Sequence, residues 1–164
     1  MAGAASLIAQ RRPWVSREEA YLLGLLHDVG RIVVAAVYGD HSALILALAA
    51  KRNVPPWNVE HQFGLSHTLI GKWVSTRWAF PPSLQAVIEF HHEPERSSQY
   101  KPEIHLVALA NILANSGEYP EYLTDDCTRT YCEKLFISED EWKGYKGDLE
   151  KIRSEVDQFW NLLM

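Results

Sequence analysis

The sequence has few cysteines, no excess of basic charge and little of the pattern typical of β-strands. Only two of its 164 residues are cysteines, Cys127 and Cys132, so it has neither a CxxC pair for zinc nor the cysteine framework of a small secreted domain. We therefore expect two buried thiols, no disulfide and a cytoplasmic location. The net charge of -5 and the pI of about 5.8 give no overall basic field, which makes nucleic acid an unexpected partner.

The hydrophobic pattern contains neither a signal peptide nor an uninterrupted apolar segment long enough for a membrane. The most apolar segment, residues 20–38, is interrupted by His27, Asp28 and Arg31, so we predict that it lies in a protein core and that the protein has no membrane partner. The first ten residues resemble the end of an amphipathic helix. We expect one domain over residues 1–164 that is N-terminally truncated or belongs to a longer chain.

Helical segments separated by Pro and Gly follow one another along the whole sequence. No Asn-Gly or Asp-Gly hairpin joins two alternating apolar runs. The fold class predicted is therefore all-α, a bundle of six or more helices. Ser16 and Ser66 are predicted N-caps, and Ser138 with Glu141 matches a capping box. The predicted helices cover residues 16–38, 41–52, 57–63, 67–78, 83–92, 103–114 and 138–163.

The pair His27-Asp28 is the most informative feature of the chain, because it lies in a segment that is apolar on nearly every helical face. A buried carboxylate and imidazole must be paired, hydrogen-bonded or bound to a metal, since burying them bare costs several kcal/mol (roughly 2–7 for a polar group). Further histidines lie on predicted helices beside residues that must face the core. The candidate metal ligands are His27, Asp28, His67, His91 and His92.

Imidazole and carboxylate together suit a divalent metal such as iron, manganese, zinc or nickel. Each residue also has an alternative explanation. His67 alone more often hydrogen-bonds a backbone carbonyl, Asp28 can pair with Arg31 on the same helical face, and His91-His92 can end a helix where the dipole favours imidazolium. Glu60 is expected to be solvated rather than functional.

Four segments in this order resemble the HD superfamily, and within it the HDOD domain, the HD-related output domain of bacterial signalling proteins. They are Leu-Leu-Gly-Leu-Leu-His-Asp-Val-Gly-Arg at 22–31, Glu-His-Gln-Phe-Gly-Leu-Ser-His-Thr-Leu-Ile-Gly at 60–71, Trp-Ala-Phe-Pro-Pro at 78–82 and Phe-His-His-Glu-Pro at 90–94. The resemblance implies a helical fold and a metal site of the kind found in the superfamily's phosphohydrolases. It also implies that His27-Asp28 is the metal-bridging pair, that His67 belongs to a His-x-x-x-Gly motif and that His91-His92 is the double histidine.

The same resemblance gives roles to three further positions. Gly71 is expected to allow close helix packing. Arg31 stands where hydrolytic relatives often have a lysine that contacts substrate phosphate, which makes it a candidate catalytic residue. Asn111 replaces the aspartate that is the family's last metal ligand, and the Gly-Tyr-Pro motif that follows the double histidine in hydrolytic relatives is absent.

Two functions remain open at this point. The first is a bacterial signal-transduction output domain with a partly retained HD metal site, whose partners are signalling proteins or domains, including further copies of itself. The alternative is a metal-dependent phosphohydrolase or cyclic-nucleotide phosphodiesterase. Retention of five ligand-type residues favours the alternative, while Asn111 and the absent motif favour the first.

Overall fold

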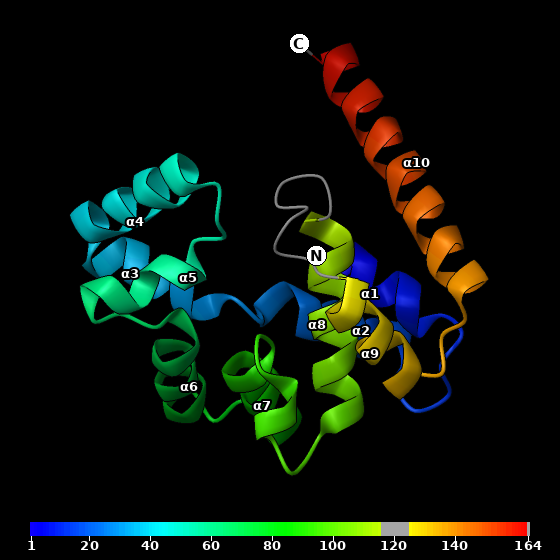
Figure 1. Ribbon diagram of the computed structural model, residues 1–164, viewed down its shortest axis with the longest axis horizontal. Coiled ribbons are helices and arrows are strands. Elements are labelled where there is room, and N and C mark those ends of the chain that lie inside the picture. Colours follow the sequence, from blue (N-terminus) through cyan, green and yellow to red (C-terminus); the bar gives the residue numbers. More distant parts are fainter. Residues whose placement is uncertain (116–124, 164) are drawn as a thin grey trace.

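The computed structural model describes residues 1–115 and 125–163, and this part of the chain is built from α-helices and two short 3-10 helices, with no strand (Figure 1). The all-α prediction is therefore confirmed. In order, the elements are α1 (Ala2–Ala9), α2 (Arg17–Leu26), α3 (Val29–Val37), α4 (Gly39–Arg52), α5 (Trp57–Glu60), η1 (His61–Phe63), α6 (His67–Arg77), α7 (Pro82–Phe90), η2 (Pro94–Arg96), α8 (Lys101–Asn115), α9 (Asp125–Lys134) and α10 (Glu139–Leu163).

Helix α8 lies at the centre of the main core, with α1, α2, α7 and α9 packed around it (Figure 1). It is apolar on nearly every face, as expected of a helix surrounded by others. Its fully buried side chains include Ile104, Leu106 and Leu109, each of which contributes about 1.5–3 kcal/mol through burial. A smaller cluster of Ile45, Ala49 and Val59 joins α4 to α5.

The predicted continuous helix over residues 16–38 is wrong in one respect, because the chain breaks at His27-Asp28. Helix α2 ends at Leu26, α3 begins at Val29, and Asp28 between them has φ -101° and ψ 18°. Neither proline nor an unusual glycine marks this break, so the apolar pattern runs across it. As a result, the Asp28 carboxyl group lies at the start of α3, where the helix dipole favours a negative charge.

A backbone contact between two glycines brings α3 against α6. A Cβ atom on Gly30 would lie 1.9 Å from the carbonyl oxygen of His67 and 2.7 Å from the amide nitrogen of Gly71. A Cβ atom on Gly71 would in turn lie 2.6 Å from the side chain of Ile88 on α7. Only glycine fits at both positions, and the close packing expected of Gly71 is confirmed.

The predicted caps are present, but one helix was not predicted. Ser16 accepts a hydrogen bond from the Glu19 amide at 3.0 Å, and Ser138 and Glu141 cap each other at 3.0 and 3.2 Å. Helix α9 was missed because its sequence is mostly polar and lacks apolar periodicity. It buries Cys132 and leaves Cys127 exposed, so the expectation of two buried thiols holds for Cys132 only, and neither forms a disulfide.

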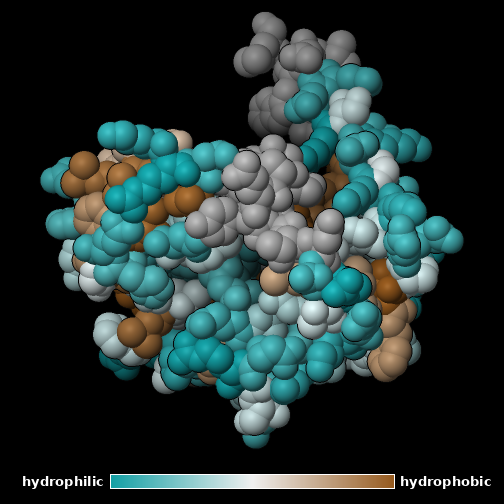
Figure 2. Space-filling model, viewed as in Figure 1, coloured by the Kyte–Doolittle hydropathy of each residue, from teal (hydrophilic) through white to brown (hydrophobic). Residues whose placement is uncertain are grey.

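Within the described residues, one segment, Arg17–Val37, is long and apolar enough to cross a membrane by length and composition alone. A core helix passes the same test. Here the segment is two helices, α2 and α3, separated at the His27-Asp28 break. Several of its apolar side chains are nevertheless exposed, among them Leu22, Leu25 and Ile32. Figure 2 also shows apolar surface on the lobe that contains α3 and α4.

Candidate metal centre

Four side chains from three parts of the fold meet at one place, two of them buried and two half-buried. Asp28 comes from the start of α3, His67 from the first turn of α6, and His91 and His92 from the end of α7. One nitrogen or oxygen atom of each lies within 4.8 Å of those of the other three. His67 and His91 are each only 1% exposed, whereas Asp28 and His92 are half-buried, so the group is rooted in the protein interior and reaches solvent on the Asp28 side.

The carboxylate of Asp28 is the centre of the group. Its Oδ1 lies 3.2 Å from Nε2 of His67 and 3.5 Å from Nε2 of His91, and its Oδ2 lies 3.3 Å from Nε2 of His27. Despite these short distances, neither Oδ1 of Asp28 nor Nε2 of His27 makes a hydrogen bond of good geometry. All five predicted ligands are thus brought together, with His27 beside the second carboxylate oxygen.

Backbone carbonyls set the orientation of two of the imidazole rings. Nδ1 of His27 lies 2.9 Å from the carbonyl oxygen of Gly24, and Nδ1 of His91 lies 3.1 Å from that of Val87. A carbonyl can only accept, so Nδ1 carries the proton in both rings and Nε2 presents its lone pair towards Asp28 when the ring is neutral. This is the tautomer that a metal-binding histidine requires.

Glu60 performs the same task for His67, and the prediction that Glu60 is solvated is wrong. Its carboxylate is buried and accepts from the His67 amide at 2.8 Å and from Nδ1 of His67 at 2.7 Å. The turn at Gly64, which has φ 66°, reverses the chain so that the end of α5 meets the start of α6. In sequence, the only signal was a glutamate seven residues before a histidine with a glycine between them.

The charges within the group are strongly coupled. Burial by itself would raise the pKa of Asp28, but the imidazoles of His27, His67 and His91 hold it well below its usual range. Burial likewise opposes protonation of His67, yet the nearby carboxylates of Asp28 and Glu60 raise its pKa overall. Burial lowers the pKa of His91 to about 4, so this ring is neutral at pH 7.

His92 is held by an aromatic stack instead of a hydrogen bond. Its ring lies on the indole of Trp57 from α5, with centroids 4.2 Å apart and planes inclined by 21°. Burial lowers the pKa of His92 well below its ordinary value, and its Nε2 is buried without a hydrogen-bond partner. A neutral ring with an unused nitrogen beside three other donor atoms is a suitable metal ligand.

Arg31 lies on the more exposed side of the group. Its Nε is 3.3 Å from Oδ2 of Asp28, and its side chain is 35% exposed. The sequence alternative of an Asp28–Arg31 pair is therefore realised at the same time as the histidine cluster. Asn111, in contrast, uses its side-chain oxygen to accept from Asn115 on the same helix at 2.7 Å.

These donor atoms fit a first-row divalent cation. Such ions bind imidazole nitrogen and carboxylate oxygen at about 2.0–2.2 Å, so opposite ligands are roughly 4 Å apart. The observed separations of up to 4.8 Å are close to this value. The unpartnered Oδ1 of Asp28 and Nε2 of His92 would both gain a partner. His27 extends the set on the Oδ2 side of the carboxylate.

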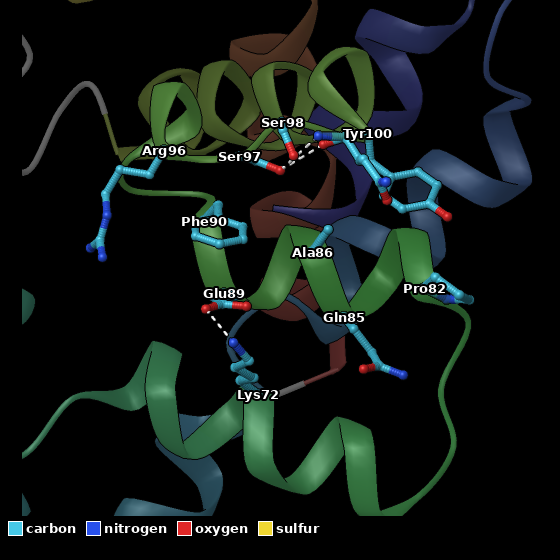
Figure 3. Close-up of a pocket in the computed structure, with 11 residues that line it drawn as sticks. Lys72, Pro82, Gln85, Ala86, Glu89, Phe90, Arg96, Ser97, Ser98 and Tyr100 are labelled. Carbon is cyan, nitrogen blue, oxygen red and sulfur yellow. Dashed lines mark hydrogen bonds and ion pairs between the residues drawn. The ribbon is translucent and has the colours of Figure 1, made fainter.

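A separate hollow of about 320 Å³ lies between α6, α7 and the segment that precedes α8 (Figure 3). Lys72 and Glu89 form an ion pair of 2.6 Å across it, as the dashed line in Figure 3 shows. Arg96 and Tyr100 also line it. None of the five predicted ligands is among its lining residues, so this hollow is distinct from the histidine cluster.

One known protein is similar to this chain in sequence. A protein of Treponema pallidum (strain Nichols), named as uncharacterized, is 33% identical over 106 residues, which are 62% of this chain and 21% of that protein. The chain therefore spans about a fifth of that relative's length. Over the matched region the two chains are similar, and the comparison assigns no activity.

Two solved structures are similar in fold. A candidate signal transduction protein of Marinobacter aquaeolei VT8 superposes with a TM-score of 0.81 at 20% identity, covering 96% of this chain and 36% of that one. A candidate phosphohydrolase of Shewanella amazonensis SB2B superposes with a TM-score of 0.67 at 24% identity, covering 92% and 56%. At these identities the two structures show the fold alone.

The family itself is shown by a match in sequence. The HDOD domain family matches residues 1–94, more than half of the chain, and this range contains His27, Asp28, His67, His91 and His92. The resemblance inferred from the four ordered motifs is thereby confirmed. The chain belongs to the HDOD domain family.

Proposed function

We propose that this protein is a regulatory output domain of bacterial signal transduction whose histidine–aspartate cluster binds a divalent metal ion. The observation that carries the proposal is the convergence of Nε2 atoms from three histidines on the Asp28 carboxylate, with each Nδ1 held by an acceptor. The ligands would be His27, Asp28, His67, His91 and His92. The donor types suit iron, manganese, zinc or nickel.

Two departures from the pattern of hydrolytic relatives favour a regulatory role over catalysis. The position at which hydrolytic relatives have a last carboxylate ligand is Asn111, an uncharged side chain already hydrogen-bonded to Asn115. The Gly-Tyr-Pro motif is replaced by Glu93-Pro-Glu-Arg. The similar fold of the candidate signal transduction protein of Marinobacter aquaeolei supports this direction. We propose that the partners are signalling proteins or domains in the cytoplasm.

Phosphohydrolase activity is the second candidate, and one observation favours it. Arg31 lies next to the cluster on its exposed side, where a guanidinium could hold a substrate phosphate with two hydrogen bonds. A bound metal would supply Lewis acidity and an activated water at this place. The fold shared with the candidate phosphohydrolase of Shewanella amazonensis is compatible with this alternative.

Elemental analysis of the protein purified without added metal or chelator tests the proposal. We expect one or two equivalents of a first-row metal in the wild type, loss of that metal in Asp28→Ala, and no loss in His61→Ala, which removes an exposed histidine outside the cluster. Circular dichroism should show that the helices persist in Asp28→Ala. Equal metal in wild type and Asp28→Ala would show that the ligand assignment is wrong.

The main structural alternative gives a different result. If the cluster is only a buried polar network, the wild type should contain no metal, and Asp28→Ala should lower the free energy of unfolding by about 3–5 kcal/mol because buried imidazoles lose their partner. Hydrolysis of bis(p-nitrophenyl) phosphate by the metal-loaded protein then separates the two functions. Release of p-nitrophenol that Arg31→Ala abolishes would favour the phosphohydrolase.

A further inference from the structure

Helix α10 packs against the domain over only its first half. Trp142 and Tyr145 are buried against the main core, and the Tyr145 hydroxyl lies 3.5 Å from the carbonyl oxygen of Ile8. Leu149 is partly buried, whereas Ile152, on the same helical stripe, is 43% exposed. Figure 1 shows the C-terminal half of α10 leaving the body of the molecule. The apolar stripe therefore continues beyond the core that covers its beginning.

The sequence of α10 repeats apolar residues with the period of a coiled coil. The apolar residues follow one another at alternating intervals of three and four residues. From residue 150 onward, every residue on the opposite side of the helix from this stripe is polar. The apolar residues are Trp142, Tyr145, Leu149, Ile152, Val156, Phe159 and Leu163. The polar residues are Glu150, Lys151, Ser154, Asp157, Gln158 and Asn161. A period of 3.5 residues is the signature of a left-handed coiled coil rather than of a helix on a globular core.

The C-terminal half of this 25-residue helix needs a partner, because the main core covers only the first half. Isolated helices shorter than about 12–15 residues are marginal in water, and most helices are stabilised by packing of their apolar face. Figure 2 shows hydrophilic side chains on the visible, coloured part of α10. Within the described residues, α10 contacts mainly α1 and α8, and Arg153 also reaches the Ala114 carbonyl on α8.

Charges that flank the apolar stripe indicate which partner fits. Asp148 and Glu155 precede the stripe positions at 149 and 156, while Arg153 follows the position at 152, and all three are exposed. In a parallel pair of such helices, Asp148 faces Arg153 of the partner subunit, an attraction made twice by symmetry. In an antiparallel pair, the position that precedes the stripe faces the same kind of position on the partner, so Asp148 would face an acidic side chain, Glu155 of the partner subunit, and the two would repel.

We propose that residues 148–163 of α10 form a parallel two-stranded coiled coil with a second copy of this chain. The apolar stripe provides the contact, and the Asp148 and Arg153 charges select the same chain in parallel orientation. An interface of about two heptads is short, so the dimer should dissociate on dilution. This arrangement would place two HDOD domains side by side at one end of the coil.

Sedimentation velocity of the whole protein over a wide concentration range tests the association. We expect the mass to rise from 18.7 kDa towards twice that value with concentration. Ile152→Asp should abolish the rise, while Lys151→Asp, a charge change at the neighbouring outward position, should leave it. A monomer at every concentration, or a dimer that survives Ile152→Asp, would overturn the proposal.

Charge exchange tests the parallel orientation. Asp148→Arg and Arg153→Asp should each weaken the dimer by about tenfold, because each replaces two attractions with two repulsions. The double variant should restore wild-type affinity. Because Arg153 also contacts the Ala114 carbonyl, thermal melting of the Arg153→Asp variant checks that the fold is kept. A double variant weaker than both single variants would exclude the parallel pair.

Discussion

Replacement of Glu60 by glutamine tests whether the buried glutamate prepares His67 for metal binding. The Glu60 carboxylate accepts two hydrogen bonds from His67, at 2.8 Å from the amide and at 2.7 Å from Nδ1. Both are accepted by Oε2, and the second carboxylate oxygen also lies 2.8 Å from Nδ1. Glutamine keeps the shape of the side chain but removes its charge and puts an NH2 group in place of one of the two oxygens. The remaining oxygen can still accept from the amide and from Nδ1, but both hydrogen bonds are weaker because the acceptor is neutral, and the second contact with Nδ1 is lost.

The size of the effect follows from the kind of contact that is changed. Loss of a partner that orients a metal-binding histidine typically lowers metal affinity 10–100-fold, which is about 1.4–2.7 kcal/mol. The fold should lose less, about 1 kcal/mol, because the glutamine oxygen still accepts from the buried donors of His67. We therefore expect Glu60→Gln to bind metal measurably more weakly while it remains folded with a similar melting temperature.

Competition with a chromophoric chelator measures this difference directly. Glu93→Gln is the matched control, since it makes the same chemical change at a side chain that is 63% exposed and paired with Arg96 on the surface. The control should bind metal as the wild type does. If Glu60→Gln also retains wild-type affinity, the carboxylate does not support His67 as a ligand, and this account of the Glu60–His67 pair is incorrect.

Further predictions concern packing, the polar hollow and the two thiols. Gly30→Ala should lower the free energy of unfolding by about 3 kcal/mol or more and reduce the metal content, because the new Cβ would lie 1.9 Å from the His67 carbonyl oxygen. Urea unfolding measures the loss, and the control is Gly39→Ala, which should cost little because nothing lies within 4 Å of its Cβ. Lys72→Ala should change the free energy of unfolding by less than about 1 kcal/mol, since its ion pair with Glu89 is partly exposed. The metal content should stay the same, and a loss of metal would contradict the separation of the hollow from the histidine cluster. Burial raises the pKa of Cys132 to about 11, so its thiol stays protonated between pH 7 and pH 9 and should react slowly with Ellman's reagent. Exposed Cys127 should react quickly, and fast reaction of two thiols per chain would refute this.

Much of the local structure follows from residue patterns. Ser16, Ser66 and Ser138 cap helices where their spacing predicts, because these caps are contacts between residues three apart. The helical fold and the family follow from the repeated apolar periodicity and from four ordered motifs. Helix α9 escapes such reasoning because it is mostly polar.

The candidate site could be predicted as a set of residues but not as a geometry. His27, Asp28, His67, His91 and His92 stand out because polar groups on apolar helices need partners, and that requirement is visible in the sequence. The role of Glu60 is not visible, because it depends on the turn at Gly64 that brings α5 to the start of α6. The break between α2 and α3 is equally hidden, since it lies within an unbroken apolar pattern.

Local spacing thus determines the helices, their caps and the types of side chain available for the site, because these depend on neighbours a few residues apart. Tertiary packing alone decides where those side chains meet. The close approach of Gly30 and Gly71 brings Asp28 to His67, and the packing of α6 on α7 adds His91. These contacts join residues tens of positions apart, and their distances depend on how helices cross, which no pattern within a single helix specifies.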